Sequence, residues 1–280
     1  MTEPVTDRRL LAANARVAAS ELRGQVTAPR FTDGTWQRVR VPVADLLSAP
    51  GGPRDRQLLY GQRIRVFDIH EGHAFVQSER DGYVGHVAAD ALGTDGVVTH
   101  RVAVRATHLY PAPDLKRHEL GWLSHGSLLT VTGHHGAWCR TDSGAHVPAA
   151  HLAPLDGPPA DPVEVARGLL GTPYLWGGNS AAGIDCSGLV QAALVAAGHA
   201  CPGDSDQQRE ALGEVLAEDV PPRPGDLYFW RGHVAMAVDG ATLIHANAHH
   251  MAVASEPIRT ALERIGAREF GQLLARKRLP

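Results

Sequence analysis

This sequence of 280 residues has few cysteines and few aromatic residues, and it has no excess of positive charge. Three cysteines cannot form a closed set of disulfides, so we expect a reducing compartment or a thiol kept free for chemistry. Lys and Arg number 27 against 30 Asp and Glu, and the net charge of −3 offers no basic field for phosphates. The composition therefore argues against a nucleic acid partner.

Long apolar runs are also absent. No window approaches the roughly 18 apolar residues that a membrane-spanning helix needs, which argues against a membrane partner. Charged and polar residues between positions 8 and 21 interrupt what would be the apolar core of an export signal. We therefore expect a cytoplasmic protein, with an exported one as the alternative.

Residues 1–35 are predicted to form an N-terminal helical extension. A helix over 7–23 would be capped by Asp7 and closed by Gly24, with apolar residues near one face.

Between residues 36 and 156 the pattern changes to short strand-like runs separated by Gly, Pro and Asp, which is typical of small all-β barrels. HVAADAL (86–92) lines up with HVPAAHL (146–152), 60 positions later. A tandem duplication explains this better than chance, so we expect a first barrel over 36–97 and a second over 98–156.

Residues 157–280 have the pattern of an α+β domain. Helices are predicted over 161–171, over 186–197 and from 205 onward, where Ser205 and Gln208 would form a capping box. Strands are predicted over 226–230, 233–238 and 242–247.

Cys186 lies where a Gly-rich turn enters the second of these helices. A thiol at a helix N-terminus faces unpaired N–H groups, which we expect to lower its pKa and to stabilise an oxyanion. The alternative is a buried structural cysteine, the interpretation that we give to Cys139 and Cys201.

A nucleophilic cysteine needs a base, and His233 and His245 lie in adjacent predicted strands. A two-residue loop at 239–240 would place the two histidines on opposite faces of the sheet. A three-residue loop over 238–240, with Gly240 left-handed, would place them directly opposite each other, with Cβ atoms about 5 Å apart. One imidazole could then take the thiol proton while the other orients it.

Several motifs in this region resemble the NlpC-type papain-like cysteine peptidases. They are YLWGG (174–178), GIDCSG (183–188), GDL (225–227), GHV (232–234) and His245. The two upstream barrels resemble the bacterial SH3-like modules that precede such domains. Over residues 36–280 the chain is similar to the γ-D-glutamyl-L-diamino-acid endopeptidases.

This resemblance implies hydrolysis of the bond between D-Glu and a diamino acid, such as diaminopimelate, in peptidoglycan stem peptides. It implies Cys186 as nucleophile, His233 as base and His245 as the residue that orients it. Asp185 would bind the free amine of an N-terminal L-Ala, and Tyr174 would lie near the oxyanion. The other positions that match the substrate groove are Trp176, Ser187 and Ser205. No metal or organic cofactor is implied.

The first barrel supplies two further matched positions. Tyr83 resembles a barrel tyrosine that contacts the L-Ala amine, although it could equally be an ordinary rim aromatic. Gln62 stands where relatives usually have Glu, and losing a carboxylate beside an ammonium weakens the contact by about 1–3 kcal/mol. We therefore expect a cytoplasmic endopeptidase of cell-wall peptide recycling. The alternatives are an exported peptidoglycan hydrolase, a Cys/His acyltransferase or amidase, and a non-enzymatic wall-binding module.

Overall fold

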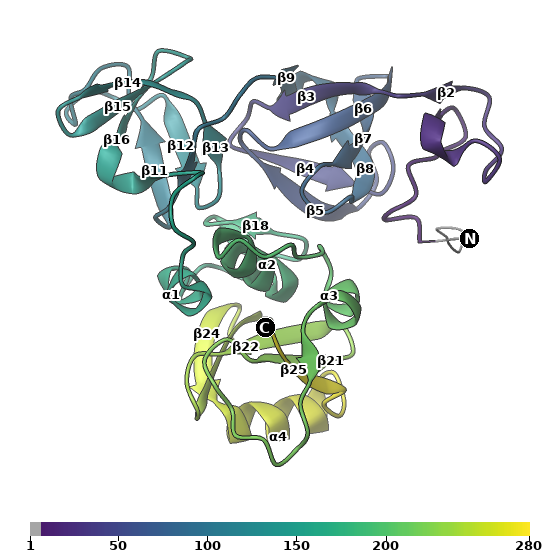
Figure 1. Cartoon of the computed structure of the whole chain (residues 1–280), viewed down its shortest axis with the longest axis vertical. Coiled ribbons are helices and arrows are strands. Elements are labelled where there is room, and N and C mark those ends of the chain that lie inside the picture. The colour runs from purple at the N-terminus through teal and green to yellow at the C-terminus, as the bar shows by residue number, and fades with distance from the viewer. Residues whose placement is uncertain (1–6) are drawn as a thin grey trace. The chain divides into compact units, whose positions relative to one another are not determined.

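The computed structural model describes residues 7–280, which divide after Asp156 into two compact units (Figure 1). Each buried hydrophobic cluster draws its residues from one unit alone, so each unit has its own core.

The start of the N-terminal unit is not the predicted helix. Over residues 7–35 the structure has two-residue strands β1 (Ala18–Ala19) and β2 (Phe31–Thr32) and a single 3₁₀ turn, η1 (Ser20–Leu22). The side chains of Asp7 and Asn14 accept hydrogen bonds from backbone N–H groups two or three residues later, and such local bonds compete with a helix. The apolar residues instead bury themselves against Phe67 and Phe75.

A first β module (residues 35–94) follows, built on one antiparallel sheet with strand order β5-β4-β8-β7-β6-β3-β9. Its strands are β3 (Thr35–Val39), β4 (Val43–Leu47), β5 (Arg54–Leu59), β6 (Arg63–His70), β7 (His73–Ser78), β8 (Val84–Ala88) and β9 (Leu92–Thr94). A 3₁₀ turn, η2 (Ala89–Ala91), joins the last two strands. Alternating apolar residues such as Leu46 and Ile64 fill the core.

The second β module (residues 100–154) consists of three small antiparallel sheets, ordered β13-β10-β17, β11-β12 and β14-β15-β16. Its strands are β10 (His100–Val102), β11 (Ala106–Leu109), β12 (Gly121–Ser124), β13 (Leu128–Leu129), β14 (Val131–His135), β15 (Trp138–Thr141), β16 (His146–Pro148) and β17 (Leu152–Pro154). A 3₁₀ turn, η3 (Ala149–His151), joins β16 to β17. Strand, 3₁₀ turn and strand thus recur 60 residues after β8, η2 and β9, as the sequence repeat predicts.

The C-terminal unit contains four helices and a six-stranded antiparallel sheet ordered β20-β25-β21-β22-β23-β24. The helices are α1 (Pro162–Gly168), α2 (Cys186–Ala196), α3 (Ser205–Ala211) and α4 (Ile258–Arg268). The strands are β18 (Asn179–Ser180) and β19 (Gly183–Ile184), which form a separate hairpin, and β20 (Glu214–Val215), β21 (Leu227–Trp230), β22 (His233–Ala237), β23 (Thr242–Asn247), β24 (Ala252–Pro257) and β25 (Ala275–Arg278). The predicted helices and strands of this unit are confirmed within a few residues.

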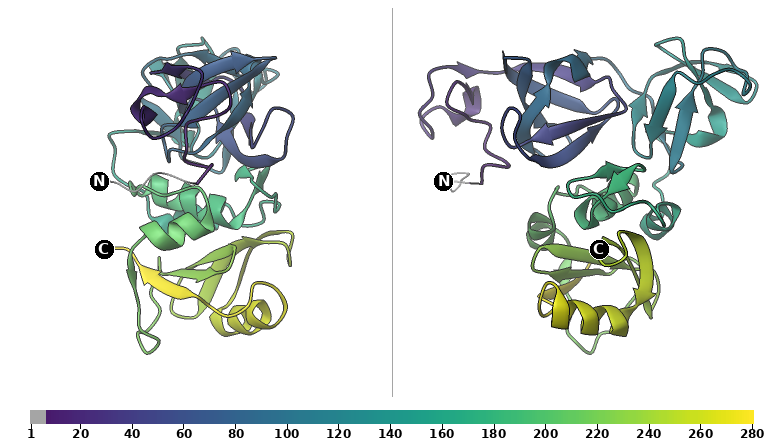
Figure 2. Two further views of the ribbon diagram at one scale, coloured as in Figure 1. Left: turned by 90° about the vertical axis from the view of Figure 1, so that its right-hand side faces the viewer. Right: turned by 180° about the vertical axis from the view of Figure 1, so that it is seen from behind.

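The helices cover both faces of the six-stranded sheet. Residues of α1 and α2 pack with Leu227, Phe229 and Met236 on one face, and α4 packs with Tyr228 and Leu243 on the other. Figures 1 and 2 show α2 and α4 on opposite sides of the strands. This α+β arrangement places the start of α2 beside strand β22.

The predicted capping box of α3 is wrong. Asp204 is the N-cap residue and Ser205 is the first helical residue. Gln208 is fully buried and donates hydrogen bonds to the carbonyl oxygens of Ser187 and Pro202, so it anchors α3 to the start of α2.

None of the helices within residues 7–280 combines the length and the apolar character that crossing a bilayer requires.

Candidate active site

Cys186 is the first residue of α2, as predicted, and only 7% of it is exposed. Asp185 is the N-cap residue and accepts hydrogen bonds from the N–H of Gly188 at 2.7 Å and from the Ser187 hydroxyl at 3.0 Å. Its second oxygen accepts the N–H of Gly177 at 3.0 Å. One carboxylate therefore fixes both the helix start and the loop that precedes it.

Glycines allow this loop to lie directly on the helix. A Cβ at Gly188 would lie 2.5 Å from the carbonyl oxygen of Gly178, and a Cβ at Gly178 would lie 2.5 Å from that of Gly183. Backbone packs against backbone here, which leaves no room for a side chain.

The thiol of Cys186 lies among backbone N–H groups in a dry environment. Burial raises the pKa of the Cys186 thiol to about 12, and the neighbouring Asp185 carboxylate acts in the same direction. The N–H groups of Val234, Ser187 and Cys186 itself lower the pKa, but by less than burial raises it. The expected lowering of the thiol pKa is therefore wrong, because desolvation outweighs the helix N-terminus. The same N–H groups remain suited to stabilising an oxyanion.

His233 and His245 lie side by side, but not in the predicted register. Met236 pairs with Ile244 and Ala237 with Leu243, so the loop is Asp239–Ala241 and Gly240 is not left-handed. In this register His245 is diagonal to His233 on the same face. The Nε2 atom of His233 lies 2.8 Å from Nδ1 of His245.

Apolar surroundings keep the imidazole of His233 neutral. The residue is 2% exposed, and its ring stacks on Phe270 with the ring centres 5.0 Å apart. Burial lowers the pKa of His233 well below its usual value, and the neighbouring His245 adds to this effect. A neutral imidazole is therefore available to accept the thiol proton.

Sequence reasoning missed the next residue in the chain of contacts, Glu256 on β24. The Nε2 atom of His245 lies 2.7 Å from Oε1 of Glu256, whose carboxylate also pairs with Arg264 of α4. Glu256 pairs with Leu243 across the strands, and so it is diagonal to His245 on the same face. The alternating run AVASEP (252–257) predicts a strand with Glu256 on one of its faces. The sequence alone does not give the register that places this face beside His245.

The predicted groove residues of this unit take different positions. Tyr174 is half-buried, and burial together with the nearby Cys186 raises its pKa, which places it near the thiol. Trp176 is 69% exposed on the same loop. Ser187 is buried against Asp185, and Ser205 begins α3.

Tyr83 and Gln62 belong to the first β module and are both buried. Tyr83 packs in the core of that module, with the guanidinium of Arg56 5.8 Å from the ring centre. Gln62 is 4% exposed, between β5 and β6. Their expected contact with an L-Ala amine stays a prediction.

Cys139 and Cys201 occupy sites unlike that of Cys186. Cys139 lies in β15 with its Sγ 3.5 Å from Nδ1 of His134, and burial raises its pKa. Cys201 is 2% exposed and donates a long hydrogen bond to Pro202. Neither lies at a helix N-terminus, in agreement with a structural role.

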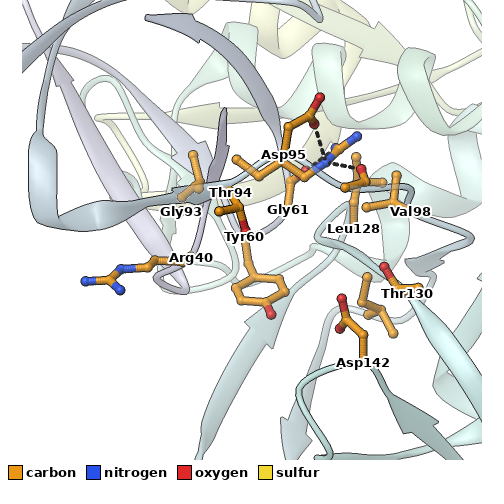
Figure 3. A pocket seen from close by; sticks show the side chains of 14 residues that line it. Arg40, Tyr60, Gly61, Gly93, Thr94, Asp95, Val98, Leu128, Thr130 and Asp142 are labelled. Atoms are coloured by element: carbon orange, nitrogen blue, oxygen red, sulfur yellow. Dashed lines mark hydrogen bonds and ion pairs between the residues drawn. The ribbon is translucent and has the colours of Figure 1, made fainter. Parts of the chain in front are cut away.

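The N-terminal unit also holds a pocket of about 500 Å³ between its two β modules (Figure 3). Tyr60 of the first module extends towards Asp142 and Thr130 of the second. The guanidinium of Arg38 is already engaged by the carbonyl oxygens of Gly61 and Gly96. No Cys or His is among the residues that line this pocket, whereas Cys186 and the hydrogen-bonded pair His233 and His245 lie in the C-terminal unit.

Comparisons with known families agree with this location. Residues 171–263 match the NlpC/P60 family, and residues 46–92 match the bacterial dipeptidyl-peptidase SH3 domain. The first match contains Cys186, His233, His245 and Glu256.

Among curated proteins, the chain is 35% identical over 106 residues to a gamma-D-glutamyl-L-lysine dipeptidyl-peptidase of Bacillus subtilis, covering 35% of each chain. It is 31% identical over 146 residues to the protein of that name from Bacillus cereus, covering 48% of this chain and 43% of the relative. The matches thus span less than half the length of these relatives.

A solved structure supports the fold over a longer range. The crystal structure of an NlpC/P60 family protein from Bacillus cereus has a TM-score of 0.75 and 21% identity, covering 88% of this chain and all of that one. At this identity the likeness shows the fold alone. The two family matches show that residues 171–263 form an NlpC/P60 peptidase domain and that a bacterial SH3 domain, matched over residues 46–92, precedes it.

Proposed function

We propose that this protein hydrolyses the bond between the γ-carboxyl group of D-glutamate and a diamino acid in peptidoglycan stem peptides. The observations that carry the proposal are the buried thiol of Cys186 at the start of α2, close to the N–H of Val234, and the hydrogen-bonded pair of His245 and His233, the residue before Val234. The names of the curated relatives, which specify a γ-D-glutamyl-L-lysine bond, support the substrate class.

The proposed reaction begins from a neutral thiol and a neutral imidazole. His233 takes the proton of Cys186 as the sulfur attacks the γ-carbonyl carbon, and the N–H groups around the thiol stabilise the oxyanion. The tetrahedral intermediate collapses as His233 gives the proton to the departing amine. Water, deprotonated by His233, then hydrolyses the thioester and restores the thiol.

We extend the proposal to the free amine of an N-terminal L-Ala. Asp185 is the proposed carboxylate for this amine. Tyr83 and Gln62 are proposed as further residues near the amine, on the basis of the family resemblance. Trp176, Ser187 and Ser205 are proposed as groove residues, and we propose that the second β module is also an SH3-like barrel.

The test is mass spectrometry of L-Ala-γ-D-Glu peptides that end in L-lysine or in diaminopimelate, each with a free or an acetylated N-terminus. Release of L-Ala-D-Glu by the wild type, and no release by Cys186→Ala, is expected. The control is Cys139→Ala, which removes a buried thiol that also has a histidine neighbour and should retain activity.

The outcomes separate the parts of the proposal. Cleavage of the acetylated peptides as well would overturn the amine requirement and keep the peptidase. No cleavage of any peptide would overturn the peptidase proposal in favour of acyl transfer or amidase chemistry on another substrate.

We propose a reducing compartment for this activity, in cell-wall peptide recycling. Support comes from the three cysteines, which are buried and form no disulfide among the described residues.

A further inference from the structure

We propose that Glu256, held by Arg264, is a positioning residue that fixes the protons of both histidines and so makes Nδ1 of His233 the catalytic base. This inference rests on the proposed function, because it assigns a role within the same reaction. It concerns two residues that lie beyond the Cys–His–His set.

The carboxylate of Glu256 sets the direction of its hydrogen bond with His245. Glu256 is 8% exposed and lies against the guanidinium of Arg264, which also pairs with Glu269. Burial alone would raise the pKa of Glu256, but hydrogen bonds from His245 and Arg264 overcome this and lower it to about 2. An ionised carboxylate can only accept. His245 must therefore donate from Nε2.

The hydrogen bond between the two imidazoles carries this direction from His245 to His233. A neutral imidazole that carries its proton on Nε2 has an acceptor at Nδ1. Because Nδ1 of His245 lies 2.8 Å from Nε2 of His233, we infer that a neutral His245 accepts here and that Nε2 of His233 donates. His233 then carries its own proton on Nε2 and leaves Nδ1 without one.

The thiol proton needs an acceptor on His233. Nε2 of His233 is engaged by His245, so Nδ1 is the ring nitrogen left to accept a proton. Cys186 faces the N–H of Val234, the residue that follows His233. Through two hydrogen bonds, the carboxylate of Glu256 thus leaves Nδ1 of His233 as the nitrogen that would take the thiol proton in the proposed reaction.

Without Glu256 the neutral His245 could carry its proton on either nitrogen. A proton on Nδ1 would meet the proton of His233 Nε2, and His233 would have to turn or take the inactive tautomer. Besides Glu256, the charged and titratable groups that act on this pair are Arg264 of α4, which also pairs with Glu269, and His250 between β23 and β24.

The kinetic test compares Glu256→Gln and Arg264→Met with a control, Glu263→Gln. The control changes an exposed glutamate of α4 that pairs with Arg259. We expect kcat to fall roughly 10- to 1,000-fold in Glu256→Gln with KM nearly unchanged. The wrong tautomer of His233 would impair proton transfer from Cys186 and not substrate binding. Arg264→Met should give a smaller fall in kcat, and Glu263→Gln none. An unchanged kcat in Glu256→Gln would overturn the proposal.

Nitrogen-15 NMR of the histidine side chains tests the same inference without substrate. In the wild type, both His233 and His245 should carry their proton on Nε2. A wild-type His245 with its proton on Nδ1 would overturn the proposal, even if Glu256→Gln failed to fold. This measurement also separates the two proposals, because the tautomers can be read if no peptide is cleaved.

Discussion

At the scale of single residues, the resting state of Cys186 differs from the thiolate–imidazolium pair expected when a helix N-terminus dominates. Burial and Asp185 keep the proton on sulfur, and burial keeps it off His233. In the proposed reaction, proton transfer is then part of the attack on the substrate and not a step completed beforehand.

This state predicts the pH dependence of alkylation. Since the pKa of the Cys186 thiol is raised to about 12, the thiolate fraction grows with pH throughout the neutral and alkaline range. The rate of modification by iodoacetamide, followed by mass spectrometry, should rise by about tenfold per pH unit up to roughly pH 10. A rate that is already constant between weakly acidic and neutral pH would contradict a protonated thiol.

The lowered pKa of His233 predicts the acid limb of peptide hydrolysis. Protonation removes the base, and it occurs only below the usual histidine range because burial opposes the charge. We expect kcat/KM to stay constant as the pH falls through about 6.5 and to decline only at lower pH. A decline centred on the ordinary histidine pKa would show a solvated base.

Asp185 provides a residue-level test of stability. Asp185→Ala removes the acceptor for Gly177, Ser187 and Gly188, and we expect a loss of about 1–2 kcal/mol in the free energy of unfolding. Asp185→Asn keeps an oxygen for the Gly188 N–H and should lose less. Urea denaturation of both variants measures the difference, and equal losses would argue against the capping role.

At the scale of secondary-structure elements, two helical glycines form a matched pair. Gly188→Ala would press a Cβ onto the carbonyl oxygen of Gly178, whereas the nearest atom to a Cβ at Gly266 in α4 is 3.7 Å away on the side chain of Gln272. We expect Gly188→Ala to lose about 1–3 kcal/mol of stability. Gly266→Ala should gain up to about 1 kcal/mol, because alanine favours helix. Thermal and urea unfolding of both variants would test this, and equal effects would contradict the close approach.

The elements that could be predicted from the sequence are those specified by local signals. Helix α2 begins after an N-cap Asp and ends before Gly198, and its apolar periodicity is regular. The segment after Asp7 carries similar signals and yet forms no α-helix. There, Asn14 closes a local turn and the apolar residues are buried against β6 and β7, a tertiary effect that local patterns do not contain.

The register of the two histidines shows why the site could be predicted from the sequence only in part. The side chain of Asp239 accepts the N–H of Ala241, and Val238 donates to Thr242, which moves the loop one residue beyond the predicted one. The shift keeps both histidines on one face but makes them diagonal. Glu256 could not be predicted, because its place beside His245 depends on this register and on that of β24.

At the scale of the whole molecule, the chain is organised around separate cores. Leu155 donates a backbone hydrogen bond to Thr99, and Ala160 donates one to Ala196, so residues 156–159 connect the two units. Most of these connecting residues are exposed. The connection therefore contributes little to either core.

A protease site inserted between Asp156 and Pro159 tests this organisation. After cleavage, buried amides such as those of Leu123 and Ile244 should keep their protection from hydrogen exchange, because each unit retains its core. Loss of protection in either unit after cleavage would show that its fold depends on the intact chain.

The protonated state of Cys186 has a consequence for the survival of the enzyme between turnovers. Peroxide oxidises thiolates and not thiols, so a nucleophile that keeps its proton at rest is a poor target. We therefore expect the burial that keeps the proton on Cys186 also to make the resting protein slow to be inactivated by peroxide.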